Sequence, residues 1–351
     1  MEVQKELSEM LEHIPQPGFC VMENQVAALN AAARGLFLAA GTDIRPLLLT
    51  GREEYAAFSG GCLCLTLKVG DQSRSAVVTR VGSCDVFFLD PDCTNRELRS
   101  MALAAQELRK PLSNVMTTLD SLSSLPQSPE SEAQLAMLNR GLYQLLRVVG
   151  NMSDAGFVSS HQETRNITAL LEELFRKAAA LAEQAGLTLR YTGLSETVYC
   201  LVDADRLERA VLNILSNAIK FTPAGGTIDA ALVRQGRTLR LSIRDSGSGI
   251  AGELLGSLFT RYLRQPALED SRFGLGLGMV LVRSAATAHG GTVLIDQPQG
   301  TGTRVTLTLS IRQSSETTLR SPILRVDYAG ERDHALVELS DTLPSRLYLH
   351  E

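Results

Sequence analysis

The segment that decides the fold reads LNILSNAIKF, at residues 212–221, and it closes a longer stretch with helical periodicity. Over residues 205–221 apolar side chains recur every three or four positions, which predicts an amphipathic helix with one buried side. Asn213, Asn217 and Lys220 share the opposite face. Amide oxygens can ligate a hard cation and an ammonium can pair with phosphate. The helix alone fits a cation–phosphate site and an ordinary solvated face equally well.

A second block, RDSGSGI at residues 244–250, follows an alternating strand that ends at Asp245. Gly247 and Gly249 allow the backbone to turn sharply against a flat ligand. A carboxylate at this position can accept a hydrogen bond from an exocyclic amine such as that of adenine.

A third block, FGLGLGMV at residues 273–280, places Gly274, Gly276 and Gly278 before a new helical pattern. Glycines that run into a helix N-terminus present free N–H groups and a positive dipole end to anions. Each glycine motif is a weak signal alone. Their order, completed by AHGGTV at residues 288–293, is a strong one.

In this order the blocks resemble the N, G1, F and G2 boxes of the GHKL ATP-binding fold of sensor histidine kinases, over residues 167–311. The resemblance implies ATP and Mg²⁺ as ligands. Asn217 would ligate Mg²⁺, with Asn213 and Lys220 near the phosphates, and Asp245 would take the adenine amine. The same resemblance assigns the pocket and its lid to Gly247, Gly249, Phe259, Arg264, Gly274, Gly276 and Gly278.

Two departures from the family pattern fall in the lid. Thr260 and Arg261 stand where the family usually has an acidic residue and a proline, and Arg272 replaces an extra glycine. An arginine so close to the phosphate loop either clamps phosphate or shortens the motion of the lid.

Two further segments predict an antiparallel helical hairpin. Residues 94–122 carry apolar side chains at alternating steps of three and four, with a capping box at Thr94 and Glu97. Ser128 and Pro129 then begin a second helix with the same rhythm. One hairpin has an apolar seam to bury, so we expect two chains to pair into a four-helix bundle. The alternative is a coiled-coil linker without chemistry.

On the first helix, AAQELRKPL at residues 104–112 resembles the H box, in which a histidine accepts the γ-phosphoryl group. The acceptor position here is Gln106, whose amide nitrogen has no free basic lone pair. Glu107, which would assist an imidazole, remains. Lys110 has no acceptor for the water that the family uses in dephosphorylation. These exchanges indicate loss of chemistry on a preserved scaffold. A displaced acceptor such as His161 is the alternative.

The first ninety residues follow a strand–turn–strand–helix pattern over residues 14–36 and then three alternating segments near residues 62–69, 75–81 and 85–89. This order resembles a PAS sensor domain; a small α/β domain that aids dimerisation is the alternative. Five of the six cysteines lie in or just after this region without metal-ligand spacing, so we expect buried, reduced thiols of a cytoplasmic protein.

Composition narrows the class of partner. The formal net charge of −5 argues against nucleic-acid binding, and the most apolar stretch, residues 26–40, is too short to span a bilayer. After residue 311 the chain leaves the resemblance. Its tail holds two alternating pieces, at residues 323–328 and 335–339, which either add strands, dock on a partner or form a structural cover.

The sequence thus predicts an α+β multidomain protein with a PAS-like sensor (1–90), a dimerising hairpin (91–160), a GHKL ATP-binding domain of α/β sandwich type (161–312) and a C-terminal extension (313–351). Its expected function is a cytoplasmic, homodimeric histidine-kinase-family protein that binds MgATP, cannot phosphorylate itself at position 106 and acts on a response regulator or partner kinase. Three alternatives remain open: an active kinase using a displaced or partner histidine, a serine kinase of the anti-sigma type, and a non-catalytic scaffold.

Overall fold

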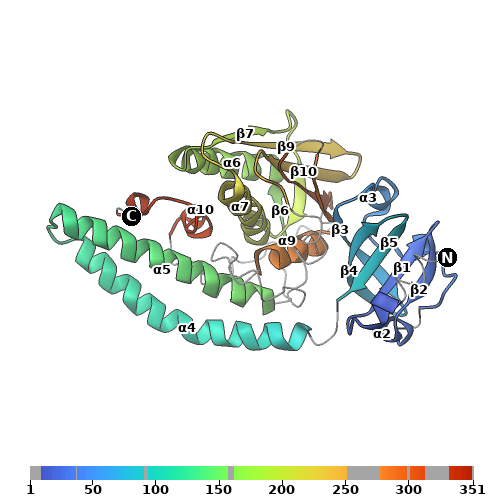
Figure 1. Cartoon of the computed structure of the whole chain (residues 1–351). Helices are drawn as coiled ribbons and strands as arrows, with labels where there is room; N and C mark the ends of the chain where they lie inside the picture. The colour runs from blue at the N-terminus through green and yellow to red at the C-terminus, as the bar shows by residue number, and fades with distance from the viewer. Residues whose placement is uncertain are drawn as a thin grey trace.

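The computed structural model describes residues 9–36, 38–90, 94–156, 162–250, 277–298, 301–312 and 332–349. An N-terminal α/β unit, a long helical hairpin and a C-terminal α/β unit (residues 162–312) follow one another along the chain, and the hairpin lies along one side of the C-terminal α/β unit (Figure 1). No helix within these described ranges is long and apolar enough to cross a membrane.

The N-terminal unit is an antiparallel sheet with strand order β2-β1-β5-β4-β3 and short helices. Its elements are β1 (Gly18–Met22), β2 (Gln25–Leu29), α2 (Ala31–Arg34), η1 (Arg45–Leu47), α3 (Arg52–Ala56), β3 (Cys62–Val69), β4 (Gln72–Val81) and β5 (Cys84–Leu89). Asn30 caps α2 and its amide also donates to the carbonyls of Leu11, Ile14 and Gln16. The order of strands and helices in this unit agrees with the order predicted from the sequence.

The hairpin consists of α4 (Thr94–Ser123) and α5 (Pro129–Gly156). The Ser128 hydroxyl accepts a hydrogen bond from the Ser131 amide at 3.2 Å, which is the predicted start of the second helix. Helix α4 continues through Pro111 and bends along its length (Figure 1).

Only part of the apolar seam of the hairpin is buried within one chain. Leu119, Leu135 and Leu142 are buried between the helices and the rest of the molecule. The exposed large apolar side chains of the hairpin are Leu103, Leu108, Val115, Leu122, Leu125, Met137, Leu138, Leu145 and Val148. The hairpin therefore presents an apolar surface that this chain alone does not cover.

The C-terminal α/β unit packs helices against a mixed sheet, and among the strand pairs of its described residues only β7–β9 is parallel. Its elements are β6 (Glu163–Asn166), α6 (Ile167–Gln184), β7 (Thr188–Thr192), β8 (Tyr199–Val202), α7 (Ala204–Phe221), β9 (Thr227–Gln235), β10 (Thr238–Asp245), α9 (Leu277–Ala288), β11 (Val293–Asp296) and β12 (Arg304–Ser310). Apolar residues of α6, α7, α9 and the strands form one core.

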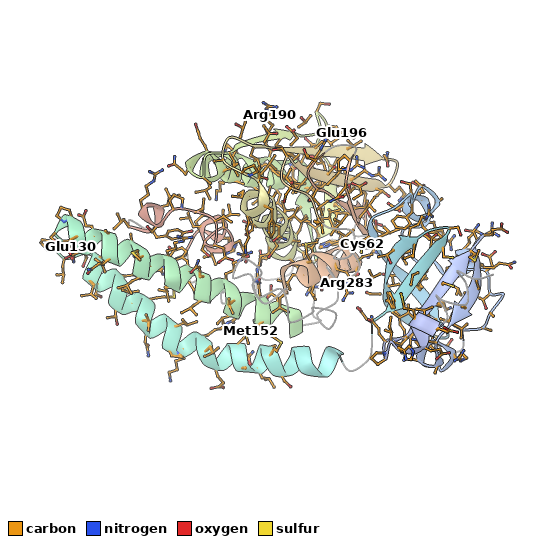
Figure 2. The ribbon with its side chains drawn as sticks, viewed as in Figure 1. Cys62, Glu130, Met152, Arg190, Glu196 and Arg283 are labelled. Atoms are coloured by element: carbon orange, nitrogen blue, oxygen red, sulfur yellow. The ribbon has the colours of Figure 1, made fainter. Side chains whose placement is uncertain are left out.

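The two sheets join edge to edge, which the sequence did not predict. Strand β3 pairs antiparallel with β11, with Cys62 opposite Ile295 and Cys64 opposite Val293, so that ten strands form one sheet. The Arg283 guanidinium of α9 forms an ion pair with the Asp90 carboxylate at 2.8 Å just beyond β5. Figure 2 labels Cys62 and Arg283 at this junction.

The described end of the chain, which we call the C-terminal tail (residues 332–349), contains α10 (His334–Glu338) and η3 (Ser345–Tyr348). The alternating piece at residues 335–339 is helical, so of the three alternatives left open it does not add a strand; it covers α5, α6 and α7 of the same chain. Asp333 caps the helix by accepting from the amides of Ala335 and Leu336. The helix packs on α5, α6 and α7, so Ala335, Val337 and Leu339 are all buried although they alternate along the sequence. Burial on more than one side removes the helical period from the pattern. The other piece, residues 323–328, lies outside the described residues.

The junction makes a testable prediction at Gly61, which has φ +89° and where a Cβ would lie 2.2 Å from the Ile295 carbonyl oxygen. We expect Gly61→Ala to separate β3 from β11 and to lower the free energy of unfolding by about 2 to 4 kcal/mol, measured by urea denaturation. Gly82→Ala is the matched control, because φ is +61° there but nothing lies within 4 Å. It should cost only about 1 to 2 kcal/mol. Equal losses would contradict a tight junction.

Candidate functional site

Helix α7 places its predicted amide face against α5, α9 and the C-terminal tail. Asp203 caps the helix by accepting from the Arg206 amide, and the apolar side packs into the core. Asn213 is almost fully buried, Asn217 is half-buried, and Lys220 lies in the last turn with Nζ 6.0 Å from the Phe221 ring centroid. The three residues thus occupy successive turns of one helix face.

The start of α9 lies directly over this face. A Cβ at Gly278 would be only 2.7 Å from Asn213 Oδ1, so the close approach requires glycine. The Asn217 Nδ2 donates to Met279 Sδ at 3.6 Å. The structure therefore brings the amides of the first block against the end of the third block, as the order of the motifs predicted.

Asp245 ends β10 in a tight, buried turn. Its Oδ1 accepts from the amides of Gly247 at 2.9 Å and Thr303 at 3.1 Å. A Cβ at Gly247 would lie 2.4 Å from the Phe221 carbonyl oxygen, so this turn also touches the end of α7. Burial raises the pKa of the Asp245 carboxyl above its ordinary value, despite the two backbone donors that lower it.

Gly249 follows with φ +76°, a left-handed conformation that favours glycine. A Cβ there would lie 2.5 Å from Gln297 Nε2, so the turn also approaches the segment after β11. The remaining predicted pocket residues, Phe259, Arg264, Gly274 and Gly276, lie outside the described residues, as do Thr260, Arg261 and Arg272.

The acceptor position lies apart from this region. Gln106 and Glu107 are exposed on α4, next to the fully buried Ala105, and Lys110 is exposed one turn later. Helix α5 lies between α4 and the C-terminal α/β unit (Figure 1). Gln106 thus lies on the exposed side of α4, as predicted. The amide face of α7 contacts α5 and not α4 in this arrangement.

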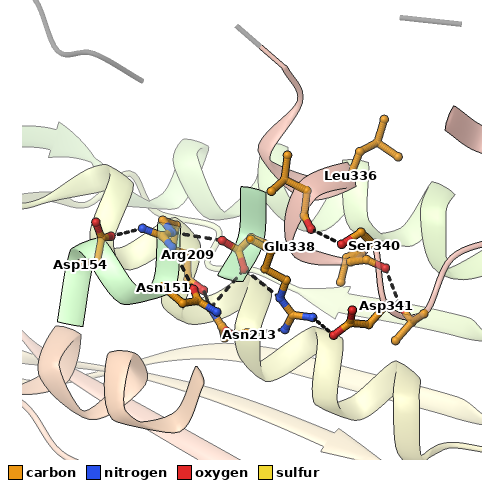
Figure 3. Close-up of polar contacts among 12 residues, drawn as sticks. Asn151, Asp154, Arg209, Asn213, Leu336, Glu338, Ser340 and Asp341 are labelled. Carbon is orange, nitrogen blue, oxygen red and sulfur yellow. Dashed lines mark hydrogen bonds and ion pairs between the residues drawn. The ribbon is translucent and has the colours of Figure 1, made fainter. Parts of the chain in front are cut away.

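The sequence missed a buried polar cluster between α5, α7 and the C-terminal tail, drawn in Figure 3. Arg209 of α7 pairs with Asp154, donates to Asn151 Oδ1 at 2.9 Å and donates to Glu338 Oε1 at 3.1 Å. Glu338 Oε2 also accepts from Asn213 Nδ2 at 3.4 Å. The signal that could have found the cluster is the glutamate between Val337 and Leu339, in an otherwise apolar piece of the tail.

The described histidines offer no replacement acceptor close to these amides. His289 is buried, its Nε2 accepts from the Asp203 amide at 2.9 Å and its Nδ1 lies 2.7 Å from the Ala285 carbonyl oxygen. Burial lowers its pKa, so it is a neutral structural residue. His13 is exposed in the N-terminal unit, and His334 lies in the tail 3.9 Å from Glu208. His161 and His350 lie outside the described residues.

Comparison with known proteins agrees with the geometry. Residues 202–313 match the family model of the histidine kinase-, DNA gyrase B- and HSP90-like ATPase. The chain is 31% identical over 229 residues to the sensor histidine kinase CusS of Escherichia coli K12, covering 62% of this chain and 46% of CusS. It is 31% identical over 223 residues to the histidine protein kinase DivJ of Caulobacter vibrioides, covering 61% of this chain and 37% of DivJ.

Among solved structures, full-length ShkA in complex with AMPPNP is similar at 22% identity and a TM-score of 0.49, covering 61% of this chain and 46% of that one. The chain spans less than half the length of CusS and DivJ. The matched segment is a domain of the GHKL ATPase class. Residues 202–313 are therefore a histidine kinase-type ATPase domain, and the chain is similar to histidine kinases over about three fifths of its length.

Asp245 makes a pH-dependent prediction. Because its pKa is raised in the folded state, its favourable contribution is present at low pH and is lost as the pH rises through the folded pKa. Asp245→Asn keeps the acceptor oxygen but removes the buried charge. We expect the melting temperature of the variant, relative to wild type, to rise between about pH 4 and pH 7.

Thermal unfolding across this pH range measures the effect, and Asp229→Asn, an exposed carboxyl on the neighbouring strand β9, is the matched control. The control should show no such rise. If Asp245→Asn were less stable than wild type by the same amount at every pH, the buried charge of Asp245 would not destabilise the fold and the prediction would be wrong.

Proposed function

We propose that the C-terminal α/β unit binds MgATP and that the chain regulates a two-component pathway through this binding without phosphorylating itself at position 106. The observation that carries the proposal is the meeting of three sequence blocks. The start of α9 lies against the amides of Asn213 and Asn217, and the Asp245 turn lies against the end of the same helix at Phe221. The family membership of residues 202–313 supports ATP as the nucleotide.

In the proposed site Asn217 contributes the protein ligand to Mg²⁺. Its amide nitrogen points to Met279 Sδ, which leaves the amide oxygen for a cation. Among the described residues, no group of three or more His, Cys, Asp or Glu could hold a metal. A magnesium ion bound mainly by phosphate oxygens and water needs only one or two protein oxygens, so the site fits the ion.

The remaining roles follow from residue chemistry. Asn213 and Lys220 lie near the phosphates, and Asp245 accepts from the adenine amine with Oδ2, because Oδ1 already accepts from two backbone amides. The glycines at 247, 249, 274, 276 and 278, with Phe259 and Arg264, complete the pocket. When bound, Mg²⁺ supplies charge neutralisation for the triphosphate.

The pseudokinase assignment rests on Gln106. An amide nitrogen delocalised into its carbonyl cannot attack phosphorus, and the exposed neighbour Glu107 has no imidazole to assist. Control of a partner kinase or response regulator by nucleotide-dependent conformation is the function that a preserved scaffold without an acceptor can still perform.

Dimerisation is supported by the uncovered apolar surface of the hairpin. Two copies that bury Leu108, Val115 and Leu122 of α4 against Leu138 and Leu145 of α5 form a four-helix bundle of the kind proposed. The N-terminal unit acts as the PAS-like sensor in this scheme, and residues 1–90, 91–160, 161–312 and 313–351 are its functional segments.

The proposed cytoplasmic location is supported by the thiols. Cys20, Cys62, Cys64, Cys84 and Cys200 are all free and buried. Unpaired buried thiols suit a reducing compartment.

A thermal shift tests nucleotide binding. ATP at a hundred times its dissociation constant adds about 2.7 kcal/mol to stability. We expect the melting temperature to rise by about 5 to 10 °C with Mg²⁺. Asn217→Ala should abolish the part of the rise that depends on Mg²⁺, whereas Asn114→Ala on the exposed side of α4 should leave it unchanged. A full Mg²⁺-dependent rise in Asn217→Ala would remove the metal-ligand assignment.

Radiolabelling with γ-³²P-ATP tests the loss of the acceptor. We expect no acid-labile phosphate on the wild-type chain, because Gln106 offers no nucleophile. Asn217→Ala identifies any label that arises from contaminating kinases, since that label would persist in the variant. Acid-labile phosphate that appears on wild type and disappears in Asn217→Ala would establish instead an active kinase with a displaced histidine.

A further inference from the structure

The carboxylate of Glu338 is the most deeply enclosed charge in the described structure outside the proposed nucleotide site, with none of its side chain exposed. Arg209 Nε lies 3.1 Å from its Oε1, and Arg147 Nε lies 3.3 Å from its Oε2. Asn213 Nδ2 approaches the same Oε2 at 3.4 Å (Figure 3). A buried carboxylate is tolerated only with such partners, because removing it from water costs several kcal/mol.

The partners come from two different parts of the molecule. Arg147 belongs to α5 of the hairpin, whereas Arg209 and Asn213 belong to α7 of the C-terminal α/β unit. Glu338, from the tail, is thus held from both sides at once. It fastens the C-terminal α/β unit to α5.

The rest of the tail is seated along α5 through its backbone and one aromatic ring. Asn139 Nδ2 donates to the Tyr348 carbonyl at 2.9 Å, and the Tyr348 ring lies edge-on to Tyr143 with centroids 4.8 Å apart. Arg140 donates to the carbonyl of Ser340 at 3.1 Å. Together with Arg147, these residues span about two turns of α5, so the tail is docked and not merely adjacent.

We propose that Arg147, Arg209 and Asn213 form a carboxylate-binding site whose ligand is Glu338 of the chain's own tail, and that this docking restrains the nucleotide site. The site consists of ion pairs and hydrogen bonds around one carboxylate. Replacing such a set with apolar residues is often neutral or stabilising, so maximal stability does not require it. A polar site of this kind suits a tail that docks and is released reversibly.

The restraint on nucleotide follows from Asn213 and rests on the function proposed above. Its amide nitrogen donates to the Arg209 carbonyl at 2.9 Å and faces Glu338. With the tail docked, this amide is occupied and the Glu338 carboxylate lies against Asn213, one turn of α7 before Asn217, the proposed magnesium ligand. Like charges repel, so the docked tail opposes nucleotide binding and release of the tail permits it.

Hydrogen exchange on the full-length chain tests the docking directly. Glu338→Gln removes the charge and keeps the shape, and Tyr348→Ala loosens the far end of the tail without touching the ion pairs. We expect the backbone amides of residues 335–343 to exchange about thirty-fold faster or more in both variants. Glu132→Gln, an exposed carboxyl on α5, is the matched control and should exchange as wild type does.

Amides of α6 serve as the internal reference for global unfolding in each variant. Unchanged exchange of residues 335–343 in both tail variants would overturn the carboxylate site. Faster exchange in the tail with unchanged α6 supports it, whether or not nucleotide binds.

Titration with ATP and Mg²⁺ tests the restraint in the same four proteins. We expect the dissociation constant to fall about fivefold or more in Glu338→Gln and Tyr348→Ala and to stay unchanged in Glu132→Gln. Tail release with wild-type affinity would overturn the restraint. Absence of ATP binding in all four proteins would refute the proposed function instead, while the exchange data would still decide the tail site.

Discussion

The structure depends on how the polar face of α7 is compensated once it is buried. Arg209 is 3% exposed and Asn213 is 1% exposed, so each would cost several kcal/mol without partners. Asp154 and Asn151 of α5 and Glu338 of the tail supply those partners. The position of the C-terminal α/β unit against the hairpin therefore follows from the need to satisfy one helix face.

That face serves two purposes at once. Asn213 reaches towards α5 and the tail, and Asn217, one turn later, faces the start of α9. A helix transmits displacement along its axis because its backbone is rigid over such a distance. The proposed nucleotide contacts at Asn217 and the domain contacts at Asn213 therefore lie on one rigid element, which is how the tail would act on the proposed nucleotide site without entering it.

Helices and strands with one buried face could be predicted from the periodicity of their apolar residues, as α5, α7 and β10 show. The β3–β11 junction could not, because edge-to-edge pairing has no periodic signature and each strand is plausible without its neighbour. The run CLCLTLKV did contain a hint, since seven of its eight residues are buried, as expected for a strand inside a larger sheet. Glu338 was missed because its partners lie far away in sequence.

The junction also connects the N-terminal unit to the proposed nucleotide site through a short series of contacts. Strand β3 pairs with β11, β11 pairs with β12, and the Thr303 amide immediately before β12 donates to Asp245 Oδ1. The Arg304–Asp296 ion pair at 2.5 Å holds β11 and β12 in register at that end. A shift of β3 would thus move the donor that orients the proposed adenine-binding carboxylate. The C-terminal α/β unit is thus contacted by the N-terminal unit at β11 and by the tail at α7. If the proposed site lies between these two contacts, loosening either one would change its geometry.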